Sequence, residues 1–195
     1  LGSLTYFSKD TTLLRHVVSV APLSLLTPGE GLDADRFELE KARIVNYLQN
    51  QGYADFAANY ISVKGDSTSG NFSVDVIMDI LLPDGKTKHP VYRNGNIAVY
   101  TDHYHKQDTS DMLTQRLDSV LYKSEQSYFM VSPKVISNSI SFEPGGLTRR
   151  DDRIYTYNKL ANLGAYRFAE IIPSKNQQDS LLIDYNIQLT PYINK

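Results

Sequence analysis

Two histidines and an aspartate in the middle of the chain are the residues most suggestive of chemistry. His103 and His105 are one residue apart and directly follow Asp102. In an extended segment both imidazoles would lie on one face, and imidazole is a common metal ligand. A third ligand is hard to nominate, because Asp108 and Asp111 are merely nearby. A solvated loop explains the same residues. A metal-binding or hydrolytic domain centred on Asp102, His103 and His105 is therefore kept as the alternative hypothesis.

Three further groups have simpler explanations. The carboxylate pairs Glu38/Glu40 and Asp151/Asp152 could act as acid and base, but a helix start or a solvated helix face accounts for them. The pair Gly145-Gly146 is not followed by Gly-Lys-Ser or Gly-Lys-Thr, so it predicts a turn between helices rather than a phosphate loop. We predict no catalytic residue, no metal and no cofactor.

A small basic cluster stands next to one of these carboxylate pairs. Arg149, Arg150 and Arg153 surround Asp151 and Asp152. A helix start held by ion pairs explains this pattern. A contact with a partner, or with a neighbouring domain, is the sharper hypothesis for the three arginines.

Composition limits the class of partner. The 195 residues carry 20 Lys and Arg against 22 Asp and Glu, a net charge of −2, so no basic field is present to neutralise the phosphates of nucleic acid. The chain has no cysteine, which removes disulfides, thiolate metal sites and cysteine nucleophiles. No run of 18 apolar residues predicts a membrane helix. The chain starts at Leu1 without an initiator methionine, which we interpret as a sign of a trimmed or a mature fragment.

Apolar spacing predicts the elements of a first unit. An amphipathic helix is expected over 34–51, capped by Asp33 or Asp35 and ended by Gly52. A shorter helix is expected over 11–20 after an extended segment at 4–8. Alternating residues predict strands over 60–64 and 72–83.

The same order recurs in the second half of the chain. Phe142-Glu143-Pro144-Gly145 echoes Leu26-Thr27-Pro28-Gly29. The equivalent elements are an extended segment at 91–101, helices over 133–142 and 151–163, and strands over 167–172 and 180–191. The chain therefore looks duplicated, each unit reading strand, helix, helix, hairpin.

This order predicts an α+β fold, with two helices on a small three-stranded mixed sheet in each of two tandem units. The first unit covers 1–84, with a truncation of its front strand left open, and 85–90 is the linker. The second unit covers 91–195 and carries an insert at about 103–132. Within that insert we expect a helix-like run at 110–122 and a strand at 128–131.

Several of these residues together resemble the POTRA domain, a β-α-α-β-β module of outer-membrane assembly factors of the BamA/TamA type. The sequence pattern is similar to that of the TamL-like surface-antigen proteins of Bacteroidetes. The first unit contributes Leu26-x-Pro28-Gly29, Glu40, Arg43-Ile44, Leu48, Gly52-Tyr53-x-x-Phe56 and Tyr60-Ile61, and the second contributes Pro144-Gly145, Ile154-Tyr155-x-Tyr157, Leu160, Leu163-Gly164 and Ala169-Glu170-Ile171.

The resemblance implies a non-enzymatic module at the periplasmic face of the bacterial outer membrane. Its partners would be unfolded outer-membrane proteins, accessory envelope subunits and neighbouring POTRA domains, with a C-terminal β-barrel in the parent protein that this chain lacks. By the same analogy the strand after the second helix is an exposed edge that binds clients by β-augmentation. Completing the core is the other explanation for these strands. The candidate edge residues are Tyr60, Ile61, Ser62, Val63 and Lys64, and Arg167, Phe168, Ala169, Glu170 and Ile171.

Overall fold

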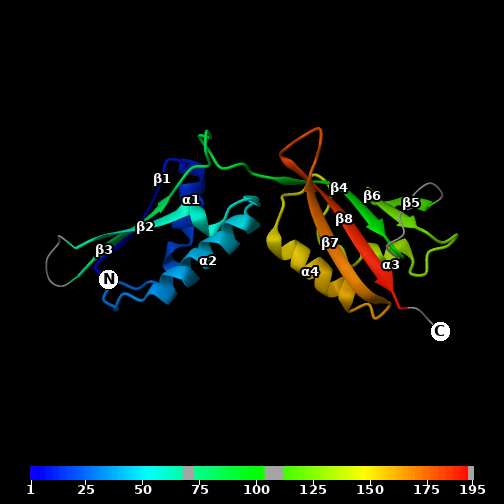
Figure 1. Ribbon diagram of the computed structural model, residues 1–195, viewed down its shortest axis with the longest axis horizontal. Helices are drawn as coiled ribbons and strands as arrows, with labels where there is room; N and C mark the ends of the chain where they lie inside the picture. Colours follow the sequence, from blue (N-terminus) through cyan, green and yellow to red (C-terminus); the bar gives the residue numbers. More distant parts are fainter. Residues whose placement is uncertain (68–72, 104–111, 193–195) are drawn as a thin grey trace. The chain divides into compact units, whose positions relative to one another are not determined.

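The computed structural model describes residues 1–67, 73–103 and 112–192, and the chain divides into two units, Leu1–Val91 and Tyr92–Lys195. In each unit helices pack on a mixed sheet (Figure 1). The predicted α+β class is confirmed. The first unit has the predicted order strand, helix, helix, strand, strand, and the second unit has the same order with two further strands after its first. The segment 85–90, assigned above to a linker, belongs to the first unit. There the backbone N–H of His89 donates to Asp10 Oδ2 at 2.9 Å.

The first unit has a three-stranded sheet in the order β1-β3-β2, with β1 parallel and β2 antiparallel to the central β3. Its elements are β1 (Leu4–Ser8), α1 (Thr11–Ser19), the 3-10 turn η1 (Ala21–Leu23), α2 (Ala34–Asn50), the 3-10 turn η2 (Ala58–Tyr60), β2 (Ile61–Asp66) and β3 (Asp75–Ile80).

Local sequence explains why these elements begin and pack as they do. The Asp10 carboxylate caps α1 by accepting the N–H groups of Thr12 and Leu13, each at 3.1 Å. On α2, Ile44 and Leu48 lie one turn apart on the buried face, where they join the core formed with α1 and the sheet. The unit is thus a helix layer on one side of a small sheet.

The second unit has a five-stranded sheet in the order β5-β6-β4-β8-β7. Strands β6 and β8 are both parallel to β4, β5 is antiparallel to β6, and β7 is antiparallel to β8. Its elements are β4 (Arg93–Tyr100), β5 (Leu113–Leu117), β6 (Val120–Ser124), α3 (Pro133–Ser137), α4 (Arg150–Ala161), β7 (Tyr166–Lys175) and β8 (Leu182–Pro191).

The insert differs from its prediction. The helix-like run at 110–122 and the strand at 128–131 are wrong: the described part of the insert forms the β5-β6 hairpin, and 128–131 is irregular. Leu113, Leu117 and Leu121 have helical spacing, but the alternation of buried Val120 and Tyr122 follows the two-residue period of a strand. The hairpin turns at Asp118 and Ser119, with φ of 50° and 64°. It adds two strands to the expected three.

Both Pro-Gly turns dock on the start of the first strand of their unit. In the first unit Gly29 N–H donates to the Leu1 carbonyl at 2.8 Å, and the Leu1 amine donates to the Glu30 carbonyl at 2.6 Å. In the second unit Gly145 N–H donates to the Asn94 carbonyl at 2.7 Å, and Asn94 N–H donates to the Gly146 carbonyl at 2.8 Å. These matched contacts make Leu1 and Asn94 equivalent positions of the repeat.

A second matched contact joins the long helix of each unit to the segment before the Pro-Gly turn. Glu40 Oε2 on α2 accepts the N–H of Leu25 at 3.0 Å. Thr156 Oγ1 on α4 accepts the N–H of Ser141 at 2.9 Å. Both side chains are fully buried, and both lie eleven positions after the glycine of their Pro-Gly turn. The predicted duplication therefore extends to hydrogen bonds in the core.

Candidate functional site

The free side of β7 is an edge of the second sheet, since β7 pairs with no strand other than β8 among the described residues. Just beyond the last registered pair, Lys175 and Ile183, Asn176 N–H donates to the carbonyl of Leu182 at 2.9 Å. Backbone groups alternate in direction along an antiparallel strand. The N–H and C=O groups of Ala169 and Ile171 therefore point away from β8, toward the open edge.

The backbone of Pro173 faces the same side of β7 as the backbones of Ala169 and Ile171. Its nitrogen faces the open edge, where the missing N–H removes no bond to β8. The backbone groups of β7 that face the open edge, its outward ladder, therefore begin with two consecutive complete residues, Ala169 and Ile171. They are interrupted at Pro173, which supplies a carbonyl acceptor but no donor. A proline at such a position limits how far another strand can pair along the edge.

A groove of about 420 Å³ runs between α4 and the outward residues of β7. Its apolar part comes from Ile154 and Tyr157 on α4, which are 39% and 48% exposed, and from β7. Ala169 and Ile171 lie opposite the buried Leu189 and Ile187, so their side chains are on the helix-covered face. The lining residues are Arg150, Arg153, Ile154, Tyr157, Ala169, Glu170 and Ile171.

The basic cluster predicted from the sequence divides over two cavities. Arg150 and Arg153 line the groove beside β7. Arg149 instead lines a separate cavity of about 410 Å³, together with Asp152. Burial raises the pKa of Asp152 above its usual value, and the nearby Arg149 only partly offsets this effect. The structure thus joins two of the three arginines to the candidate edge strand.

Charge in the groove is only weakly compensated by ion pairs. Arg150 Nη1 lies 3.7 Å from Asp151 Oδ1, and both side chains are well exposed. Arg153 Nε is buried without a hydrogen-bond partner among the described residues. Burying such a donor unpaired is unfavourable. The guanidinium groups of Arg150 and Arg153 nevertheless give the lining of the groove positive charge, which suits a carboxylate or carbonyl oxygen beside an apolar side chain.

The other β7 candidates have different surroundings. Arg167 lies at a register shift between Tyr166 and Phe168, with its guanidinium 5.0 Å from the centre of the Phe168 ring. Phe168 is 60% exposed and shares the open face of the sheet with Glu170, because each lies opposite a polar residue of β8. The backbone groups of Phe168 and Glu170 face β8, so these two residues lie beside the edge without contributing to its outward ladder.

The predicted edge strand of the first unit is also an edge. Strand β2 begins at Ile61, and the carbonyl of Tyr60 accepts the Leu81 N–H at 2.8 Å. By alternation Ile61 and Val63 turn their backbone groups outward, whereas Ser62 and Lys64 turn theirs toward β3. Lys64 Nζ also lies 2.6 Å from Asp79 Oδ2.

The alternative site around Asp102 loses its carboxylate ligand. Asp102 is buried, and its oxygens accept Ser124 Oγ–H at 2.9 Å, Glu125 N–H at 2.8 Å and Gln126 N–H at 3.0 Å. It anchors the end of β6 and is not a free ligand. His103 donates its backbone N–H to Leu189, and His105 lies outside the described residues. Within 1–67, 73–103 and 112–192 no cluster of three His, Asp or Glu could hold a metal ion.

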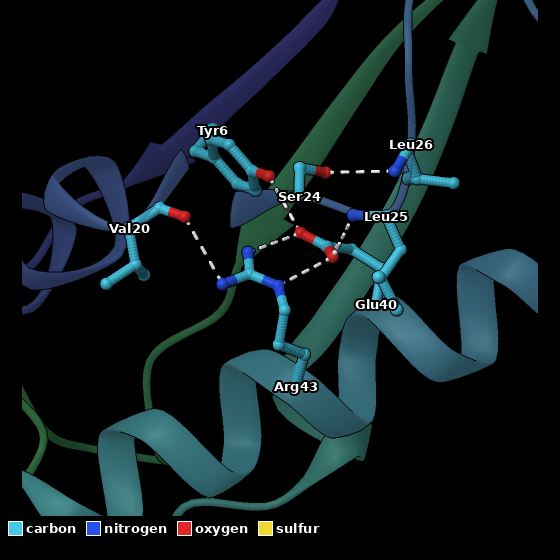
Figure 2. Close-up of polar contacts among 7 residues, drawn as sticks. All are labelled: Tyr6, Val20, Ser24, Leu25, Leu26, Glu40 and Arg43. Carbon is cyan, nitrogen blue, oxygen red and sulfur yellow. Dashed lines mark hydrogen bonds and ion pairs between the residues drawn. The ribbon is translucent and has the colours of Figure 1, made fainter. Parts of the chain in front are cut away.

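A buried polar network on α2 corrects the interpretation of Glu40 as part of a solvated helix face (Figure 2). Arg43 donates to both Glu40 oxygens, at 2.8 and 2.6 Å, and Tyr6 Oη–H donates to Oε1 at 2.9 Å. Burial acts to raise the pKa of Glu40, but the hydrogen bonds from Arg43, Leu25 and Tyr6 outweigh it and hold this pKa below its usual value. Glu40 lies one turn before Ile44 in the buried stripe, which was the overlooked signal.

No protein-family model and no curated protein sequence matches the chain. Among solved structures, BamA from Haemophilus ducreyi lacking POTRA domains 1–3 is similar over 98% of this chain, with a TM-score of 0.64 and 8% identity. POTRA1-2 of the periplasmic domain of Omp85 from Anabaena has 9% identity and a TM-score of 0.45, over 100% of this chain and 96% of that one. POTRA3-5 of Haemophilus influenzae BamA has 11% identity and a TM-score of 0.36, over 97% and 95%.

The first of these comparisons shows that the chain has the fold of the BamA POTRA domains, as the sequence resemblance predicted. The chain spans 29% of the length of that BamA chain. None of the helices in the described residues is long and apolar enough to cross a bilayer.

Proposed function

We propose that this chain is a non-enzymatic binding and scaffolding module of an outer-membrane protein assembly or export factor, working at the periplasmic face of that membrane. The observation that carries the proposal is the outward ladder of β7 beside the groove under α4. Unfolded β-barrel clients are the preferred partners, and accessory envelope subunits and neighbouring POTRA domains can use the same chemistry. The shared fold with BamA POTRA domains supports the proposal.

Capture would occur by addition of an extended segment to β7. Main-chain pairing with Ala169 and Ile171 supplies affinity without reading the sequence of the segment. Every second side chain of the added strand faces the helix layer and enters the groove over Ile154 and Tyr157. A carboxylate next to such a side chain would lie beside the positive charge of Arg150 and Arg153. The β2 edge, through Ile61 and Val63, is a second acceptor of the same kind.

The test is a titration of the isotope-labelled chain with a peptide taken from one strand of a bacterial β-barrel protein, followed by NMR. We expect saturable shifts at the amides of Ala169 and Ile171. The variant Ile171→Pro removes one outward donor and no donor to β8, so it should lose the binding while the β8 amides keep their shifts. Equal binding by this variant, or a titration with no shifts at either edge, would overturn strand capture.

A further inference from the structure

The two units differ at the outer edge of their first strand, and the difference identifies a strand-acceptor site. In the second unit β6 runs beside β4 and parallel to it (Figure 1). In the first unit the described residues place no strand on the outer side of β1. We propose that this edge of β1 accepts an extended segment of another polypeptide, running parallel to β1, at the position that β6 occupies in the second unit. The proposal goes beyond the capture at β7 and β2.

The repeat fixes which residues correspond. Leu1 is equivalent to Asn94 through the docked Pro-Gly turns, so Leu4 and Tyr6 correspond to Ile97 and Val99. The pairing within the two sheets places the same face inward in this register. Tyr6 lies beside Met78, a fully buried residue of central strand β3, as Val99 lies beside the fully buried Ile187 of β8. The docked turns therefore set the register of β1 on β4, and the sheet pairing agrees on which face is buried.

The backbone of β1 is oriented to pair outward at these positions. Val76 N–H donates to the Ser3 carbonyl at 2.9 Å, so Ser3 and alternate residues after it face β3. Leu4 and Tyr6 then turn their N–H and C=O groups to the outer side. In the second unit Thr101 N–H donates to the Lys123 carbonyl of β6 at 2.9 Å. Alternation makes Ile97 and Val99 face β6 in the same way.

The side chains of β6 show what an incoming segment should present. Val120 and Tyr122 lie opposite Ile97 and Val99 and are buried on the helix-covered face. On the other face Lys123 Nζ lies 5.1 Å from the centre of the Tyr100 ring.

The residue equivalent to Tyr100 is Phe7, which is 51% exposed. The matching segment has apolar residues at alternate positions and a basic residue over Phe7. A second copy of this chain is a poor donor, because its own β6 is already held between β4 and β5.

A synthetic peptide with the sequence of residues 118–125 is the probe. At about 90% occupancy, amide exchange at Leu4 and Tyr6 should slow about tenfold, since only the unbound fraction exchanges. Thr5 and Phe7, whose amides already face β3, should keep their rates. The variant Phe7→Ala should weaken binding, whereas Ile77→Ala, which removes an exposed side chain from the central strand, should not.

Two N-methylated peptides supply the matched control. In β6 the backbone of Leu121 faces β4 and that of Tyr122 faces β5, as the Lys123 carbonyl bond requires. Methylation at the Leu121 nitrogen should therefore abolish protection, and methylation at the Tyr122 nitrogen should leave it.

Four results would overturn the proposal. The first is absence of protection at Leu4 and Tyr6. The second is protection that persists with the peptide methylated at the Leu121 nitrogen and is lost with the peptide methylated at the Tyr122 nitrogen. The third is shifts confined to Ala169 and Ile171, which would assign the peptide to β7 and leave the proposed function intact. The fourth is a dimer in sedimentation that the peptide dissociates, since it would make a second copy the occupant.

Discussion

Replacing Pro173 by valine should strengthen the capture of extended segments at β7. The substitution restores one N–H on the outward side of the edge, next to the complete ladder of Ala169 and Ile171. A net hydrogen bond contributes about 0.5–1.5 kcal/mol, so Pro173→Val should lower the Kd for a β-barrel strand peptide by about two- to tenfold. The assay is a fluorescence-anisotropy titration of the labelled peptide, with NMR shifts confirming that binding remains at β7.

The neighbouring position separates hydrogen bonding from strand propensity. Ser174 is exposed, but its backbone faces β8 and its side chain lies on the open face of the sheet. Ser174→Val raises strand propensity without adding an outward donor, so the Kd should stay within experimental error of the parent. If both variants bind equally tightly, or if Pro173→Val binds no better than the parent, the reasoning from the outward ladder is wrong.

Three substitutions test the internal contacts. Glu40→Gln leaves the Arg43 guanidinium without its buried carboxylate and should lower the free energy of unfolding at pH 7 by about 3 kcal/mol, measured by urea denaturation. Because folding lowers the pKa of Glu40, this contribution is present above the unfolded-state pKa of about 4.3 and disappears as pH falls below it, so parent and variant should converge in acid. Asp102→Ala should speed amide exchange in the β5-β6 hairpin, whereas a zinc titration of the parent should show no site that depends on Asp102. Thr156→Val should cost about 1–3 kcal/mol by leaving the Ser141 N–H unpaired, and an unchanged urea midpoint would contradict this role.

The edge strands could be predicted because short-range signals determine them. In each unit Gly52 or Gly164 ends the long helix, an alternating segment follows, and a polar turn leads to a second alternating segment that ends near a proline. The second strand of this hairpin pairs with the first strand of the unit, β1 or β4. The first strand of the hairpin, β2 or β7, is therefore left at the edge of the sheet. What the sequence could not give was the direction of individual backbone groups, because that depends on the register with β8.

The insert was harder to predict for a physical reason. The spacing of its apolar residues fits both a helix and a strand. Leu113, Leu117 and Leu121 are four apart, as in a helix, whereas Val120 and Tyr122 are two apart, as in a strand. Local pattern cannot choose between them. The outcome depends on a long-range contact, the parallel pairing of β6 with β4, and on the Asp102 carboxylate that holds the end of the hairpin. Glu40 was misjudged similarly, because two of the three residues that donate to its carboxylate, Tyr6 and Leu25, come from other segments of the unit.

The two units satisfy the same hydrogen-bonding requirement with different side chains. The backbone N–H before each Pro-Gly turn is covered by the long helix, so the helix must supply an acceptor there. Thr156 meets this need with one hydroxyl, which also donates to the carbonyl of Asp152 at 2.7 Å. Glu40 meets the same need with a charge, which then requires Arg43 and the hydroxyl of Tyr6 to balance it. Tyr6 is one of the residues whose backbone forms the open edge of β1, so its hydrogen bond to Glu40 also ties α2 to the strand that we propose as an acceptor. The valine at the equivalent position of β4 makes no such bond, and there the edge is held by β6 instead.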